Sequence, residues 1–236
     1  TAGAVFTRRE SMTVSMPGLT LERKLWAEGA GPVAGLDEAG RGAWAGPVVA
    51  AAVILPPDRD DLPDVLAGVR DSKLCTPRQR EALYPVVLET ALAAAVGVAS
   101  AREVEEHNVV GATQLAMRRA LDALVVEVGS LLIDGRTLRL PTVNVPQYSM
   151  NEGERHSLSI AAASILAKVT RDRILIELDE VYPEYGFAQH KGYGTRLHRA
   201  ALAAYGPCEI HRRTYAPIRG SLLDAIPGAD DSSEGA

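Results

Sequence analysis

Apolar residues occur along the chain both as short continuous runs and as longer stretches with helical spacing. Two runs, at residues 32–40 and 47–55, are bounded by glycine and proline and predict two β-strands joined as a hairpin. The run "SLLIDG" at residues 130–135 predicts a buried strand that ends at Asp134. A further short strand is expected at residues 95–100.

Helices are predicted between and after these strands, because apolar residues there recur three and four positions apart. Thr76 and Pro77 suit the N-cap and the first turn of one helix. The small residues of "SIAAASILAK" suit a helix that packs closely against a sheet, and Pro183 ends that helix. The expected helices span residues 19–29, 76–94, 113–128, 156–178 and 195–205.

The two ends of the chain differ from this central part. Residues 1–19 and 220–236 are polar and lack periodicity, so we expect both ends to be disordered and residues 20–219 to form one domain. No apolar run approaches the ~20 residues of a membrane span. Cys75 and Cys208 lack the spacing of a disulfide scaffold or a thiolate metal site. We therefore expect a cytoplasmic protein.

Charge is distributed unevenly. The formal net charge is −5, which argues against a protein that coats nucleic acid by bulk electrostatics. Residues 155–219 nevertheless contain ten Lys or Arg against six Asp or Glu. This basic segment suits contact with a polyanion, and a solvated surface is the alternative.

Adjacent carboxylates, Asp37 and Glu38, lie beside a buried apolar run, and Asp134 ends another strand. Carboxylates held together in a desolvated crevice repel each other unless a cation compensates. Mg²⁺ and Mn²⁺ prefer oxygen ligands, and the sequence has no HxxxH or Cys/His cluster for zinc. The expected chemistry is phosphoryl transfer or phosphodiester hydrolysis. Since neighbours in a strand face opposite sides, we expect the strand to end at this pair, where Gly40 and Gly42 follow.

Six segments, in order, resemble those of bacterial ribonuclease HII, the type 2 ribonuclease H. They are "GLDEAGRG", "AGPVVAAAVIL", "RDSK", "LLIDG", "SIAAASILAKVTRD" and "YGFAQHKGY". The resemblance runs from about Val33 to Arg219. It implies an α/β fold in which a ribonuclease H-like mixed β-sheet is flanked by helices. It also implies a mainly helical C-terminal subdomain, at about 180–219, that helps to clamp the duplex.

The resemblance also implies an acidic metal site, formed by Asp37, Glu38, Asp134 and Glu154. The fourth acid is usually an aspartate, whereas this chain reads "NEGE" and places the longer Glu154 there, with Glu152 adding further negative charge. A surface-loop role for Glu154 is the alternative. Asp172 is a rival fourth acid, but its helical spacing from Lys168 favours an ion pair between them.

Substrate contacts follow from the same resemblance. The turn formed by Gly40, Arg41 and Gly42 matches the element that approaches the 2′-hydroxyl of the ribose. Tyr193 matches the tyrosine that packs on the sugar at the RNA-to-DNA junction, and His190 and Lys191 are expected to support its loop or touch phosphate. Candidate phosphate contacts are Lys73, Lys168, His211, Arg212 and Arg213.

The implied activity is hydrolysis of the RNA strand of RNA–DNA hybrids and incision 5′ of single ribonucleotides embedded in duplex DNA. Two Mn²⁺ or Mg²⁺ ions are the expected cofactors, and the products would carry 5′-phosphate and 3′-hydroxyl ends. The expected partners are these nucleic acids, with no membrane and with the protein as a monomer. Recruitment by a sliding clamp or a polymerase stays open.

Two alternatives to this activity also stay open. One is a type 3 ribonuclease H paralogue, which cuts hybrids but handles single ribonucleotides poorly. The other is a non-catalytic nucleic-acid-binding protein whose metal site "NEGE" has altered.

Overall fold

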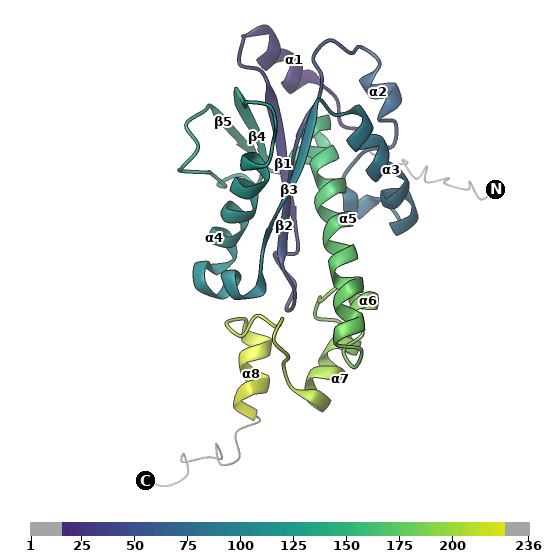
Figure 1. The fold of residues 1–236 in the computed structure, drawn as a ribbon, viewed down its shortest axis with the longest axis vertical. Helices are drawn as coiled ribbons and strands as arrows, with labels where there is room; N and C mark the ends of the chain where they lie inside the picture. The colour runs from purple at the N-terminus through teal and green to yellow at the C-terminus, as the bar shows by residue number, and fades with distance from the viewer. Residues whose placement is uncertain (1–15, 225–236) are drawn as a thin grey trace, which may run out of the picture.

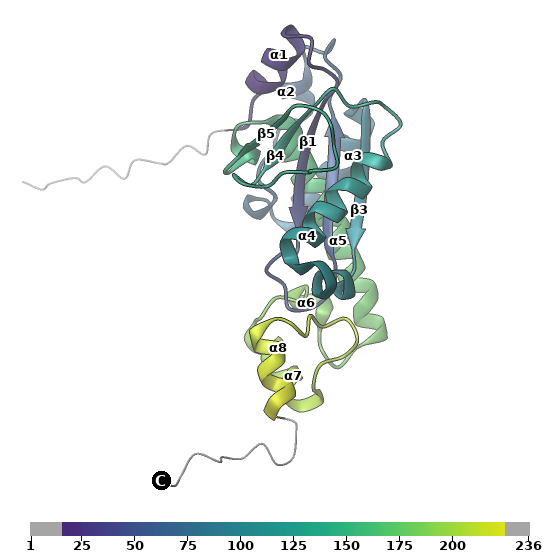
Figure 2. The same cartoon turned by 90° about the vertical axis from the view of Figure 1, so that its left-hand side faces the viewer.

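The computed structural model describes residues 16–224, which form a five-stranded mixed sheet with helices on both faces (Figures 1 and 2). The strand order is β3-β2-β1-β4-β5. The strands are β1 (Val33–Ala39), β2 (Val48–Ile54), β3 (Ala93–Ala99), β4 (Ser130–Asp134) and β5 (Gln147–Met150). The predicted α/β fold is confirmed.

The helices differ widely in length. The longest are α4 (Ala101–Asp122) and α5 (Leu158–Val181). The others are α1 (Thr20–Ala27), α2 (Leu62–Val65), α3 (Pro77–Thr90), α6 (Phe187–His190), α7 (Arg196–Tyr205) and α8 (Ala216–Asp224), with the 3₁₀ turns η1 (Ser72–Leu74) and η2 (Gly153–Arg155).

The expected hairpin is present, because β1 and β2 pair in antiparallel fashion. β4 pairs with the other edge of β1 in parallel, with Leu36 in register with Ile133. The carboxyl ends of parallel neighbours meet at one edge of a sheet. The next residues, Asp37 and Asp134, therefore lie side by side on the same face of the sheet.

Helices α4 and α5 cover opposite faces of the sheet (Figure 1). Alanines and other small residues on α5 are fully buried, which lets this helix lie close to β1. Gly35 of β1 is required at that contact, because a Cβ there would lie 2.3 Å from the backbone carbon of Ser159. The predicted close packing of "SIAAASILAK" is confirmed.

The C-terminal helices α6, α7 and α8 lie beyond the end of the sheet, next to the turn from β1 to β2 (Figures 1 and 2). A β-bridge between Ala45 and His211 joins the two parts. Helix α8 continues past the boundary expected at residue 219, as far as Asp224. Residues 1–15 and 225–236, most of the two ends expected to be disordered, lie outside the described residues.

Helix α4 differs from the helix expected at residues 113–128. It begins at Ala101, because Ser100 and Glu103 form a capping box, and it ends at Asp122. Asn108 interrupts the helical dihedral angles with a φ of 57°, which separates the first turns from the apolar stretch that the sequence pattern detects. Among the described helices, none is long and apolar enough to cross a membrane.

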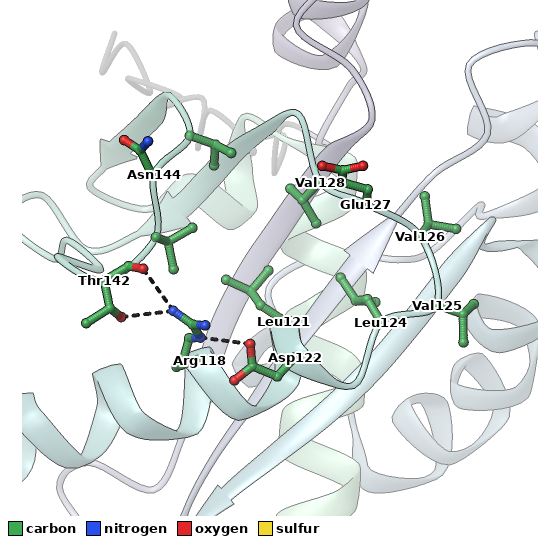
Figure 3. Close-up of a pocket in the computed structure, with 12 residues that line it drawn as sticks. Arg118, Leu121, Asp122, Leu124, Val125, Val126, Glu127, Val128, Thr142 and Asn144 are labelled. Atoms are coloured by element: carbon green, nitrogen blue, oxygen red, sulfur yellow. Dashed lines mark hydrogen bonds and ion pairs between the residues drawn. The ribbon is translucent and has the colours of Figure 1, made fainter.

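A pocket of about 350 Å³ lies between the end of α4 and the loop that leads to β5 (Figure 3). Arg118 donates to Asp122 Oδ1 at 2.8 Å and to the carbonyl oxygen of Thr142 at 2.9 Å. The remaining lining is mainly leucine and valine and includes none of the candidate site residues. The Arg118 bonds fix the loop before β5, which is a structural role.

Candidate active site

Asp37 and Asp134 form the centre of an acidic cluster at the carboxyl ends of the neighbouring strands β1 and β4. The Asp37 side chain is only 5% exposed, and its Oδ1 accepts a 2.7 Å hydrogen bond from the Glu38 amide. Ser164 of α5 lies beside the Asp37 carboxylate and lowers its pKa, which opposes the effect of burial. Asp134 Oδ1 accepts a 2.8 Å hydrogen bond from the Gly153 amide of η2. Backbone amides thus orient both carboxylates.

Glu154 joins this pair from η2, the turn directly before α5. Its side chain is 5% exposed, so it is not a solvated surface residue. Lys73 Nζ lies 4.0 Å from Glu154 Oε1 and 3.9 Å from Asp71 Oδ1. Burial, with repulsion from Asp134, raises the pKa of Glu154 to about 7. The longer side chain of "NEGE" therefore reaches the cluster.

β1 ends at Ala39, one residue after the acidic pair, and Gly40 follows as expected. Glu38 nevertheless remains in register with Ala50 of β2, so both acids lie within the strand. Successive side chains consequently point to opposite faces, with Asp37 towards α5 and Glu38 away from it. Arg41 Nη1 lies 3.2 Å from Glu38 Oε1 and holds this carboxylate.

The cluster is electrostatically strained. Burial is the main cause that raises the pKa of Asp37, and repulsion from Glu38 and Asp134 adds to it. Burial also raises the pKa of Glu38, although Arg41 opposes the shift. One oxygen of Glu38 and one of Glu154 are buried without a hydrogen-bond partner. A bound cation would relieve both the repulsion and the unpaired oxygens.

The donor atoms of the cluster fit a hard divalent cation, because they are all carboxylate oxygens. The arrangement of the side chains does not yet fit it. Within residues 16–224, no group of three or more His, Cys, Asp or Glu side chains has a geometry that could hold a metal ion. Glu38 pairs with Arg41, although it still repels Asp37 and Asp134. The four-acid metal site therefore remains a prediction that requires side chains to turn.

The turn after β1 is exposed at Arg41 and Gly42, and its backbone is fixed by hydrogen bonds from C-terminal residues. The carbonyl oxygen of Arg41 accepts hydrogen bonds from Arg212 Nη1 at 2.9 Å and from Tyr215 Oη at 2.7 Å. Gly40 has a φ of +96°, and a Cβ there would lie 2.0 Å from Arg171 Nε. By contrast, a Cβ on Gly42 would meet no atom within 4 Å. Packing against Arg171 thus requires glycine at position 40. No contact within the fold requires glycine at position 42.

Tyr193 lies on the loop between α6 and α7, and its side chain is 36% exposed. Lys168 Nζ and Arg171 Cζ lie 5.6 Å and 5.4 Å from the centre of its ring. The loop contacts the turn after β1, since the Trp44 amide donates to the Gly192 carbonyl oxygen at 2.8 Å. The structure therefore brings Tyr193 and Lys168 together, while Lys73 lies with the carboxylates.

Two predicted phosphate contacts are wrong. His211 and Arg212 are 1% and 0% exposed, because they pack between the sheet and the C-terminal helices. Arg213 is exposed. The expected pair between Lys168 and Asp172 is confirmed at 2.7 Å, and Arg80 lies 3.5 Å from the same carboxylate. These contacts support the structural role of Asp172.

Three supporting residues carry no recognisable signal in the sequence. Ser164 lies beside Asp37 and lowers the pKa of that carboxylate, and its hydroxyl donates to Ser72 Oγ at 2.8 Å, yet the sequence shows it only as one small residue of a packed helix. Glu22 is fully buried and accepts from Ser159 N at 3.0 Å, at the start of α5. Arg171 is also fully buried, and its helical neighbours give no hint of this.

Comparison with known proteins assigns the chain to a family. A profile described as "Ribonuclease HII" matches residues 34–218. The chain belongs to the ribonuclease HII family. Ribonuclease HII from Chloroflexus aurantiacus is 50% identical over 208 residues, which cover 88% of this chain and 97% of that relative. The resemblance predicted from the six segments is confirmed.

Solved structures of related proteins share the fold. Ribonuclease H2 from Pyrococcus horikoshii has a TM-score of 0.68 and 27% identity, over 81% of this chain and 97% of that one. Bst-RNase HIII, solved in complex with Mn²⁺, has a TM-score of 0.61 and 20% identity, over 85% and 73% of the two chains. The latter likeness concerns the fold alone.

Membership of the ribonuclease HII family makes this chain a ribonuclease H, an endonuclease that hydrolyses RNA in RNA–DNA hybrids. The family model that matches is that of ribonuclease HII, which favours the type 2 enzyme over the type 3 paralogue named as an alternative in the sequence analysis. Ribonuclease H enzymes depend in general on divalent metal ions, and the acidic cluster is consistent with that requirement.

Proposed function

We propose that this ribonuclease HII cleaves with Mn²⁺ or Mg²⁺ and incises 5′ of single ribonucleotides embedded in duplex DNA, leaving 5′-phosphate and 3′-hydroxyl ends. The observation that carries the proposal is the buried cluster of carboxylates with raised pKa values and two unpaired oxygens. Such a cluster destabilises the metal-free fold when it is ionised, and perturbed pKa values of this kind are typical of functional sites.

Asp37, Glu38, Asp134 and Glu154 would hold the ions. When bound, the ions supply Lewis-acid stabilisation of the charge that develops at the scissile phosphate. The Glu38 and Gly153 amides fix the two aspartates before substrate arrives. Lys73 lies against Glu154 and offsets part of the negative charge that would otherwise repel the phosphate.

Discrimination between RNA and DNA would come from the turn after β1 and from Tyr193. Gly42 is exposed and has open space where a side chain would lie, so a sugar can approach the backbone there. The fixed carbonyl of Arg41 keeps this turn in one conformation. Tyr193 presents part of its ring on the adjoining loop, where it could pack on the sugar at the junction.

The test is cleavage of a duplex DNA that carries one ribonucleotide, with a long RNA–DNA hybrid as the second substrate. Each is incubated with Mg²⁺, with Mn²⁺ and with EDTA, and the product ends are mapped. We expect metal-dependent incision on the 5′ side of the ribonucleotide. Absence of cleavage with either metal would refute the proposal, and cleavage confined to long RNA tracts would indicate type 3 behaviour.

Substitution of Tyr193 by alanine tests the junction role separately. The expected result is a larger loss of rate on the single-ribonucleotide duplex than on the long hybrid, because only the former requires the sugar at the junction to be recognised. Tyr148→Ala, at another exposed aromatic residue, is the matched control. Equal losses on the two substrates would remove the junction role of Tyr193.

A further inference from the structure

Three histidines form a buried cluster directly beneath the Tyr193 loop. His190, His198 and His211 are 7%, 0% and 1% exposed. The rings of His190 and His198 stack with their centres 4.4 Å apart and an angle of 12° between them. Phe187 packs edge-on against both of these rings. Burial in this apolar setting favours neutral imidazole rings.

The hydrogen bonds of His211 fix the position of its proton. The Cys208 amide donates to His211 Nδ1 at 2.9 Å, so this nitrogen is an acceptor and carries no proton. A neutral ring must then be protonated at Nε2. His211 Nε2 lies 3.0 Å from His198 Nε2, and it is therefore the donor of that bond.

His198 continues the chain of donors. Its Nε2 accepts from His211, so its own proton lies on Nδ1. His198 Nδ1 lies 3.1 Å from the carbonyl oxygen of Tyr193, to which it donates. Three hydrogen bonds thus run in one direction, from the Cys208 amide through two rings to the backbone of Tyr193. If either ring had the opposite tautomer, two donors or two acceptors would face each other in the relay.

The neighbouring residues of the loop are fixed independently. The Gly192 amide donates to His190 Nδ1 at 3.2 Å, and His190 Nε2 bonds the Tyr185 carbonyl oxygen at 2.8 Å. On its other side the Gly192 carbonyl oxygen accepts from the Trp44 amide. Tyr193 itself has two backbone hydrogen bonds: its amide donates to the His190 carbonyl oxygen at 3.0 Å, and its carbonyl oxygen accepts from the Thr195 amide at 2.8 Å. The relay from Cys208 adds a second donor to that carbonyl oxygen, on the residue whose ring is exposed.

We propose that His198 and His211 are positioning residues that set the backbone of Tyr193, and thereby its ring, for discrimination of single ribonucleotides. This inference rests on the proposed function of Tyr193. Neither histidine contacts the carboxylate cluster in the hydrogen bonds described above, so their effect is on selectivity between substrates. They act through a relay whose direction requires one tautomer on each ring.

The first experiment compares two substitutions of His211. In His211→Asn the side-chain oxygen can still accept from the Cys208 amide, but the side chain is too short to reach His198. In His211→Gln a side-chain NH₂ can take the place of the Nε2 donor. We expect His211→Asn to lower the ratio of single-ribonucleotide to long-hybrid cleavage about five-fold, the equivalent of one neutral hydrogen bond. His211→Gln should restore most of that ratio.

Tyr185→Phe is the matched control. It removes a partly buried hydrogen bond next to the cluster, from Tyr185 Oη to the Gly206 carbonyl oxygen at 2.7 Å, and keeps the ring that lies 5.1 Å from that of His211. None of the three hydrogen bonds of the relay involves the Tyr185 hydroxyl. We expect a comparable fall in melting temperature and an unchanged ratio. An equal fall of the ratio in Tyr185→Phe and His211→Asn, or no rescue by His211→Gln, would overturn the inference.

The second experiment reads the relay without any substrate. Long-range ¹H–¹⁵N correlation spectra of the wild-type protein at neutral pH should show His211 protonated at Nε2 and His198 protonated at Nδ1. The opposite tautomer on either ring would overturn the relay, whatever the activity. If the tautomers are as expected and the wild-type protein ignores single ribonucleotides, the proposed function fails while the relay stands.

Discussion

Replacement of Glu154 by glutamine should stabilise the metal-free protein at alkaline pH. The ordinary pKa of a glutamate is 4.5, and burial raises the pKa of Glu154 to about 7. Between these two values the unfolded chain has released its proton while the folded chain retains it. Stability therefore falls as the pH rises from 4.5 to 7, and the full penalty is present above pH 7.

The size of the effect follows from the two pKa values. At about 1.36 kcal/mol per pKa unit, the rise from 4.5 to about 7 corresponds to an upper limit of about 3 kcal/mol. Water and Lys73 at the edge of the cluster screen the charge, so we expect about 1–2 kcal/mol. For a domain of this size that difference shifts the melting temperature by about 2–8 °C.

The assay is thermal unfolding in EDTA across the pH range, for the wild type and for Glu154→Gln. The two proteins should differ little at about pH 4 and diverge above pH 7, where the variant is more stable. Excess Mn²⁺ should then stabilise the wild type more than the variant, because only the wild type offers this carboxylate. Glu152→Gln, at an exposed neighbouring acid, should change neither result. A variant that is less stable than the wild type at pH 8, or a difference that is independent of pH, would refute the reasoning.

Three further predictions concern other parts of the site. Asp134→Asn should abolish cleavage while hybrid binding in a gel-shift assay is largely preserved, and wild-type turnover would show that the acidic site lies elsewhere. Gly42→Ala should keep the wild-type melting temperature but lose activity, whereas Gly40→Ala should unfold at lower temperature because its Cβ would meet Arg171; a loss of stability in Gly42→Ala would contradict the open space described there. Burial lowers the pKa values of His198 and His211 from 6.5 to about 4, so stability should fall as the pH drops from 6.5 to 4, by up to about 3 kcal/mol for each ring. Acid unfolding of His211→Gln should show a correspondingly shallower dependence on pH, and an unchanged slope would contradict neutral burial.

The strands and their acidic residues could be predicted because a continuous apolar run bounded by glycine or proline has few other structures available. The hairpin of β1 and β2 and the strand that ends at Asp134 follow from such runs. The start of α4 was missed because its first turns depend on the cap at Ser100 and lie beyond a break at Asn108. β5 was missed because it is a short edge strand without a continuous apolar run.

The candidate site could be predicted only in part. Residue type and family resemblance identify Asp37, Asp134 and Glu154, whereas the orientation of Glu38 depends on how far β1 continues. That length is set by pairing with β2, which a pattern of apolar residues does not specify to the residue. The support from Ser164 and the burial of His211 depend on packing between segments distant in sequence, so no local pattern could reveal them.

The two buried arginines have a consequence for protein engineering. Arg171 donates to the carbonyl oxygens of Pro47, Ala45 and Lys191, and Arg212 donates to those of Gly46 and Arg41. The acceptors of these bonds are backbone carbonyls, which any residue type can supply. Replacing the two guanidinium groups would remove these donors from the carbonyls of Pro47, Ala45, Lys191 and Gly46, whereas the Arg41 carbonyl would keep its hydrogen bond from Tyr215 Oη. Consider a chimera that joins this sheet to the C-terminal helices of a relative. It should tolerate wide sequence variation across the junction if it retains both arginines, the length of the turn between β1 and β2, and the length of the loop after α6.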